Sequence, residues 1–156
     1  MARQTIINEV LAEPSHVWDL LTDPREVVLW APNVRDLEME PKDSFAVDSI
    51  RRFRLDVGGK IETVDTRITH CIDGEMFAEQ PIGGSMKLHE KVQQMKIVFR
   101  IEAVEQRSCS LILSLDYEMK GFFGKMFEKL AIGGFTSQYR LWMERLKTYA
   151  ETGRPV

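Results

Sequence analysis

The sequence predicts an α+β domain in which one long C-terminal helix packs across an antiparallel sheet. Polar and apolar residues alternate along several segments between residues 34 and 119, which is typical of strands with one buried face. Short glycine-containing or polar turns join these segments, so successive strands must run antiparallel. Residues 123–152 contain no proline and carry apolar residues at helical spacing.

The first elements follow from local signals. Residues 5–12 alternate as a strand with Ile6 and Val10 on one face. Pro14 then opens a short helix, for which Ser15 is the expected N-cap. Asp23-Pro24 ends that helix and begins a second one that runs to Trp30. No linker composition separates these helices from the rest of the chain.

Six further strands complete a predicted sheet of seven. Gly58-Gly59 and Asp73-Gly74 are strong signals for tight hairpins between them. We expect these strands over residues 34–40, 47–57, 61–72, 75–82, 88–104 and 109–119.

The long helix over residues 123–152 contains one interruption. Each glycine of Gly133-Gly134 costs roughly 1 kcal/mol relative to alanine in a helix interior. The pair therefore predicts either a bend or a close approach of the helix backbone to the sheet beneath it.

Composition limits the class of protein. A chain of 156 residues is expected to form a single domain over residues 1–156. Its 21 basic and 24 acidic residues argue against a nucleic-acid partner. Cys71 and Cys109 indicate neither a disulfide framework nor a metal site. The sequence shows neither a signal peptide nor an apolar run that could span a membrane, so we expect a soluble cytoplasmic protein.

Several motifs are similar to those of a known family. The segment from Val10 to Asp23, VLAEPSHVWDLLTD, resembles the opening of the START/Bet v 1-like (SRPBCC) superfamily, in its polyketide cyclase/dehydrase and lipid transport group. Trp30-Ala31-Pro32 and the segment from Leu146 to Glu151 also resemble family motifs. The resemblance implies a helix-grip fold, in which a curved seven-stranded antiparallel sheet wraps the C-terminal helix around an apolar cavity. It does not imply one activity, because the family includes carriers, receptors and cyclases.

The period of two along each strand predicts which side chains face such a cavity, and the helical stripe adds others. The resulting ligand-binding candidates are Phe53, Leu55, Val64, Ile97, Phe99, Leu113, Leu115, Tyr117, Met126, Phe127, Leu130 and Phe135.

Polar residues on the same faces are candidates for chemistry. Arg51, Glu62 and His70 are the possible catalytic residues. If no bulge intervenes, His89 lies on the same side as the apolar residues of strand 88–104; otherwise it lies outside the mouth of the barrel. Structural roles compete with each of these. Arg51 and Glu62 could simply pair across the hairpin at Gly58-Gly59, and His70 stands near a strand end. Tyr117 is more typical of a core aromatic.

Two functions of the cavity remain open at this point, and a third hypothesis is an adaptor that presents a lipid such as a quinone or binds another protein, with Phe122–Phe127 as the contact. No motif for covalent catalysis and no metal-ligand spacing occurs, so we expect no metal and no cofactor. The first hypothesis is therefore a carrier or binding protein for a small hydrophobic molecule, namely a lipid, a quinone or a polyketide-like compound. The alternative is a cyclase/dehydrase-type enzyme in which Arg51 holds an enolate and Glu62 or His70 is the general base.

The entry to the long helix offers a further possible partner. In Phe122–Phe127 and its neighbours, lysines alternate with phenylalanines around glycines. This pattern suits either a loop that packs onto the cavity or a contact with an anionic membrane surface.

Overall fold

The computed structural model describes residues 2–119 and 122–155, and the side chains of residues 2, 91, 93, 119, 122–133 and 135 lie outside that description. Seven strands and four helices follow one another in the order that the alternation predicts, with one added short helix. The elements are β1 (Ala2–Val10), α1 (Pro14–Thr22), α2 (Pro24–Trp30), β2 (Val34–Glu40), β3 (Ile50–Val57), β4 (Lys60–Ile72), β5 (Met76–Gly83), α3 (Leu88–Lys91), β6 (Val92–Glu105), β7 (Ser108–Met119) and α4 (Phe122–Thr152).

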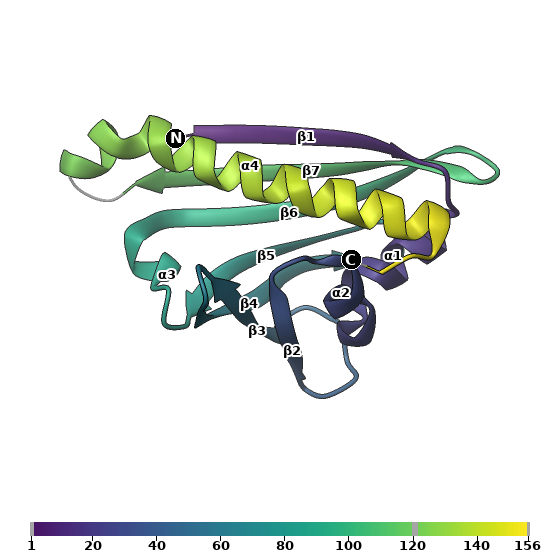
Figure 1. Ribbon diagram of the computed structural model, residues 1–156, viewed down its shortest axis with the longest axis horizontal. Helices are drawn as coiled ribbons and strands as arrows, with labels where there is room; N and C mark the ends of the chain where they lie inside the picture. The colour runs from purple at the N-terminus through teal and green to yellow at the C-terminus, as the bar shows by residue number, and fades with distance from the viewer. Residues whose placement is uncertain (1, 120–121, 156) are drawn as a thin grey trace.

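The strands form one antiparallel sheet in the order β1-β7-β6-β5-β4-β3-β2. Each strand from β2 onward pairs with the next along the chain, and β1 closes the far edge beside β7. Figure 1 shows α4 crossing the concave face of this sheet, with α1 and α2 near its C-terminal end. The predicted helix-grip architecture is therefore confirmed.

The core lies between the concave face of the sheet and the helices. Alternation along β7 places Cys109, Leu111, Leu113, Leu115 and Tyr117 inward, where each side chain is fully buried. Hydrophobic burial of this kind stabilises by roughly 25 cal/mol per Å² of apolar surface removed from water. The intervening side chains of β7 keep contact with solvent, as the sequence pattern predicts.

The two short helices begin differently from each other. The N-cap of α1 is Glu13, without a side-chain hydrogen bond, and Pro14 occupies the first turn; the prediction of Ser15 as N-cap was wrong. Because Pro14 has no backbone N–H, one of the donors that a cap would satisfy is absent. The N-cap of α2 is Asp23, whose carboxylate accepts a hydrogen bond from the Arg25 backbone N–H at 2.9 Å.

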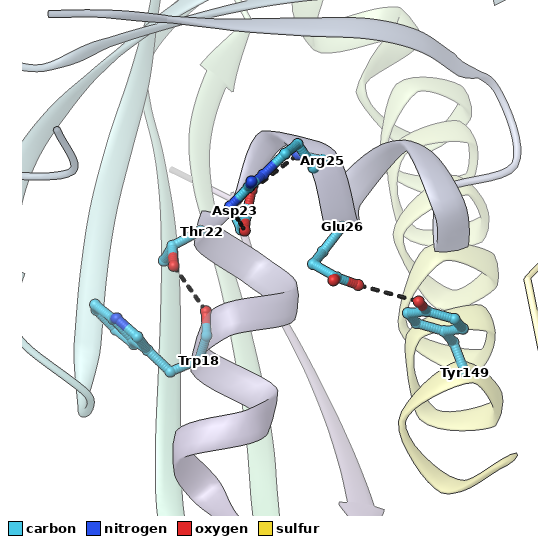
Figure 2. A network of polar contacts seen from close by, with 6 residues as sticks. All are labelled: Trp18, Thr22, Asp23, Arg25, Glu26 and Tyr149. Carbon is cyan, nitrogen blue, oxygen red and sulfur yellow. Dashed lines mark hydrogen bonds and ion pairs between the residues drawn. The ribbon is translucent and has the colours of Figure 1, made fainter. Parts of the chain in front are cut away.

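Polar contacts anchor the C-terminal half of α4 to the first helices and to β1. Figure 2 shows the Tyr149 hydroxyl donating to the Glu26 carboxylate of α2, at 3.0 Å. Burial, together with this hydrogen bond, raises the pKa of the Tyr149 phenol. On the neighbouring turn, the Glu151 carboxylate accepts from the Leu11 backbone N–H at 2.8 Å, just after β1 ends. Met143 and Leu146 are fully buried beneath these contacts.

The predicted strand over residues 88–104 was too long. Residues Leu88–Lys91 form the helical turn α3 instead, and β6 begins at Val92. The pairing of β6 with β7 then shifts between Gln93 and Lys96, where Gln94 adopts a φ of 52°. A bulge of this kind breaks the period of two, so residues before it do not share the face of those after it.

Helix α4 continues through Gly133-Gly134 as one helical element. A Cβ added at Gly134 would meet no atom within 4 Å, and the residue is exposed. For Gly134 this excludes the close approach of the backbone, which was one of the two explanations expected for the glycine pair.

Among the described residues, no helix combines the length and apolarity needed to cross a membrane.

Candidate functional site

A cavity of about 410 Å³ lies between the sheet and helices α2 and α4. Its walls come from β3, β4, β5 and β6, from the loop before β2, and from the middle of α4. Val57 and Leu141, on its lining, are 43% and 38% exposed, so the mouth opens between the β3–β4 hairpin and α4. The volume falls in the range of roughly 300–1,000 Å³ that is usual for small-molecule sites.

Aromatic rings form much of the wall. Trp142 on α4 is their centre: its ring lies 6.0 Å from Trp30 and 5.7 Å from Tyr139, both edge to face, and 6.4 Å from Phe53. Phe99 on β6 also lines the cavity. Rings at such angles present flat faces and polarised edges to whatever occupies the space between them. The lining therefore suits a molecule with flat apolar surfaces.

One buried ion pair interrupts this apolar wall. Arg51 on β3 donates from Nε and Nη2 to the two carboxylate oxygens of Glu79 on β5, each at 3.0 Å. Thr66, on the strand between them, donates its hydroxyl to Glu79 Oε2 at 2.8 Å. Arg51 Nη1 donates to the Leu21 carbonyl of α1 at 2.9 Å. The three side chains are 3–4% exposed and all line the cavity.

Three phenylalanine rings surround the Arg51 guanidinium. Its central carbon lies 4.9 Å from the ring centroid of Phe53, 5.2 Å from that of Phe77 and 5.7 Å from that of Phe45. A cation over aromatic faces is stabilised further when it is desolvated. Arg51 is thus held by a carboxylate, a carbonyl and rings, which leaves its position firmly determined.

Tyr139 on α4 adds a neutral hydroxyl to the site. Burial, followed by the nearby Glu79 carboxylate, raises the pKa of the Tyr139 phenol well above its usual value. The group therefore stays protonated at neutral pH and can donate a hydrogen bond. Among the described residues, none forms a hydrogen bond with this hydroxyl, although Tyr139 lines the cavity.

Asn33 ties the mouth of the cavity together. Its side-chain oxygen accepts from Trp142 Nε1 at 2.9 Å and from Gln138 Nε2 at 3.4 Å. Its backbone carbonyl accepts from the Asp56 N–H of β3 at 2.8 Å. One loop residue therefore connects α4 to the β3–β4 hairpin across the entrance.

The ligand-binding candidates divide into three groups. Five line the cavity: Phe53, Leu55, Val64, Ile97 and Phe99. Three are fully buried on β7 and do not line it: Leu113, Leu115 and Tyr117. Four have side chains outside the described part of the chain: Met126, Phe127, Leu130 and Phe135.

Only Arg51 of the three catalytic candidates lines the cavity. Arg51 pairs with Glu79 and stands opposite Thr66, so the alternative in which Arg51 pairs with Glu62 across the hairpin was wrong. Glu62 instead accepts from the Ser85 hydroxyl and forms an ion pair with Lys60. His70 is exposed, because the pairing of β4 with β5 shifts between Ile68 and His70 and turns its side chain off the concave face.

His89 is displaced for a similar reason. It belongs to the helical turn α3, so its predicted place on the inner face of β6 was wrong. Its neighbours Met86 and Leu88 line the cavity, and His89 does not.

Glu79 is the functional candidate that the sequence analysis missed. The strand pattern did contain a signal for it, because Phe77, Glu79 and Pro81 share one face of β5 and the first and last are apolar. A carboxylate at that register must either face the core or break the strand. The pattern gave no indication of its partner Arg51, which lies 28 residues away in sequence.

Within the described residues, no group of three His, Cys, Asp or Glu side chains gathers in a way that could hold a metal ion.

Comparison with known proteins settles the family. The family model for polyketide cyclase/dehydrase and lipid transport matches residues 2–151. The chain belongs to this family. No curated protein sequence matches the chain.

Solved structures of low sequence identity share its fold. The protein XoxI from Bacillus cereus is 16% identical, with a TM-score of 0.75 and 96% of each chain covered. A START superfamily protein from Mycobacterium smegmatis is 17% identical, with a TM-score of 0.69, over 95% of this chain and 96% of that one. The Zhui aromatase/cyclase from Streptomyces sp. R1128 is 15% identical, with a TM-score of 0.69 over 99% of both chains. At such identities the likeness shows the fold alone.

Proposed function

We propose that this protein binds a small hydrophobic molecule in the cavity between the sheet and α4, as a carrier or binding protein. The observation that carries the proposal is the cavity itself, which has about 410 Å³ of space and walls built largely of aromatic and aliphatic side chains. The family, whose members include cyclases and lipid transport proteins, is consistent with a ligand of this kind. Lipids, quinones and polyketide-like compounds remain the candidates.

The aromatic lining favours ligands with a flat ring. Trp30, Phe53, Tyr139 and Trp142 lie around one end of the space with centroid separations between 5.7 and 6.4 Å to Trp142. Ring pairs of this geometry contribute about 0.5–1.5 kcal/mol beyond the area they bury. A flat guest among these rings would gain contacts that a flexible chain does not.

The enzyme alternative needs a group that can move a proton inside the cavity. Glu62 and His70, the bases that the sequence suggested, do not line it. Arg51 does, but three of its donors are already engaged by Glu79 and Leu21. These placements favour binding over the cyclase scheme in which Arg51 holds an enolate.

Native mass spectrometry of the freshly purified protein, followed by denaturing extraction, tests the proposal directly. A co-purifying apolar molecule would support it and identify the chemical class. The affinity of a fluorescent naphthalene probe, measured through quenching of the cavity tryptophans, tests the location of the site. A probe that binds with unchanged affinity after the cavity mouth is blocked would count against this site.

Two leucines provide a matched pair of substitution sites, one on the cavity lining and one outside it. Leu141 on α4 lines the cavity, Leu29 on α2 does not, and both are 38% exposed. We expect Leu141→Trp to weaken probe binding at least about fivefold by filling the entrance, and Leu29→Trp to leave it unchanged. Equal effects of the two substitutions would place the probe elsewhere.

A further inference from the structure

The cavity contains a cation that looks suited to an acidic ligand but is already neutralised. Arg51 is the single Lys or Arg among the described residues of the lining. Its Nε and Nη2 bond to Glu79 and its Nη1 to the Leu21 carbonyl. A bidentate carboxylate is the arrangement in which a guanidinium binds an anion most strongly. Glu79 therefore occupies the position that the carboxylate of an acidic ligand would take.

The remaining charges of the lining are negative. Besides Glu79, the cavity is lined by Asp56, near its mouth, whose carboxylate pairs with Arg35 at 2.9 Å. Arg35 is on the exposed side of β2 and is not a lining residue. Because Asp56 is paired with Arg35 and Glu79 with Arg51, the described residues of the lining offer an incoming carboxylate no unpaired cation that would offset the loss of its hydration.

We propose that Glu79 makes this cavity selective for neutral ligands and excludes carboxylic acids, fatty acids among them. This inference rests on the proposed binding function and names the ligand class that the site accepts. The protein supplies the counter-ion of Arg51 itself, so that the polar wall offers hydrogen bonds without a net charge.

The polar groups that remain available fit an uncharged ligand. The protonated hydroxyl of Tyr139, for which the described residues provide no acceptor, can donate to a carbonyl oxygen. Glu79 Oε1 accepts one hydrogen bond, from Arg51 Nη2, and a carboxylate oxygen can accept another. An amide or a phenol can accept from Tyr139 and donate to Glu79, and a ketone can accept from Tyr139, whereas an ionised carboxylate has no proton to donate to Glu79.

A pair of probes with the same shape tests the inference. Naphthylacetamide and naphthylacetic acid differ in charge but hardly in size, and the acid is ionised at neutral pH because the pKa of a carboxyl group is about 4. Calorimetric titration of the wild-type protein should show the amide binding at least about tenfold more tightly than the acid. Tighter or equal binding of the acid would overturn the inference while leaving the proposed function intact.

Glu79→Gln separates the role of the charge from that of shape. The substitution retains the side-chain size but leaves Arg51 without its counter-ion, so the acid should gain at least about tenfold relative to the amide. Glu102→Gln is the matched control, because Glu102 is exposed on β6 and does not line the cavity. An unchanged ratio in Glu79→Gln would contradict the inference.

A second variant provides a test that does not depend on the folding of Glu79→Gln. Arg51→Met combined with Glu79→Leu removes both charges at once, and the preference for the amide should persist because no cation is exposed. A preference for the acid in this double variant would overturn the assignment of charge selectivity to the pair. Failure of both probes to bind the wild-type protein would refute the proposed function together with this inference.

Discussion

At the scale of single residues, the Arg51–Glu79 pair is the most consequential feature of the molecule. Removing two charges from water costs several kcal/mol per ion, and the mutual attraction offsets this only where the geometry is good and remaining donors are satisfied. Here both oxygens of Glu79 and three nitrogens of Arg51 have partners, and three rings cover the guanidinium. The two charges therefore stabilise each other, and either charge without its partner would destabilise the folded protein.

This reasoning predicts a strong coupling in stability. Arg51→Met or Glu79→Leu alone should lower the free energy of unfolding by about 3–5 kcal/mol, because each strands a buried charge. The double variant should lose clearly less than the sum, and no more than either single variant. Urea unfolding of the four proteins in a double-mutant cycle measures the coupling. Additive losses would contradict the account of a mutually neutralised pair.

At the scale of elements, the glycines separate into those that the backbone requires and those that it does not. Gly84 has a φ of 107°, and a Cβ there would lie 2.4 Å from the Thr63 carbonyl oxygen of β4. Gly134 is in regular helix and a Cβ would meet nothing. The backbone should therefore accept alanine in place of Gly134 but not in place of Gly84.

We expect Gly134→Ala to raise the free energy of unfolding by about 0.5–1 kcal/mol, because alanine loses less backbone entropy on forming helix. Gly84→Ala should lower it by more than that, since the strained φ and the clash must both be relieved. Chemical denaturation of the two variants provides the comparison. A loss of stability in Gly134→Ala would show that the helix needs a glycine there after all.

The junction of α1 and α2 predicts a dependence on pH. The Arg25 guanidinium, aided by the Arg25 backbone N–H, holds the pKa of the Asp23 carboxyl below its usual range. Figure 2 shows this contact at the start of α2. Because the folded-state pKa is depressed, its stabilisation is present above the unfolded value of about 3.9 and is lost as the pH falls further.

Asp23→Ala should cost about 1 kcal/mol near neutral pH, as loss of an N-cap usually does. Asp23→Asn retains a capping oxygen but cannot titrate, so its stability should fall less than that of the wild type between about pH 5 and 3. Denaturation midpoints across this range distinguish the variants. Parallel curves for wild type and Asp23→Asn would rule out a contribution from Asp23 ionisation.

At the scale of the whole molecule, the fold was largely predictable from sequence because its signals are local. Alternation and tight turns defined seven strands within a few residues, and the same period placed Phe53, Leu55 and Val64 on the cavity wall. The misplacement of His70 arose where a bulge changes the period, and that of His89 where a helical turn precedes β6. The Arg51–Glu79 pair depends on the side-by-side arrangement of β3, β4 and β5, which alternation within each strand does not specify.

The residues that line the cavity are spread along the chain, and this spread determines how a ligand stabilises the protein. The lining comes from α2, four successive strands and α4, so the binding site exists only when the whole domain is folded. A ligand that binds the folded state alone stabilises it by RT ln(1 + [L]/Kd), which is about 2.7 kcal/mol at a hundredfold excess over Kd. A neutral guest should therefore protect every element together rather than one region.

Naphthylacetamide at that excess should raise the free energy of unfolding by about 2.7 kcal/mol, seen as one shifted transition in urea by both tryptophan fluorescence and circular dichroism. Leu29→Trp should show the same shift, and Leu141→Trp a smaller one, because only the latter substitution reduces the affinity at the mouth. A shift seen by fluorescence but not by circular dichroism, or the reverse, would mean that the ligand stabilises only part of the domain. That result would contradict the expectation that all the elements lining the cavity unfold together.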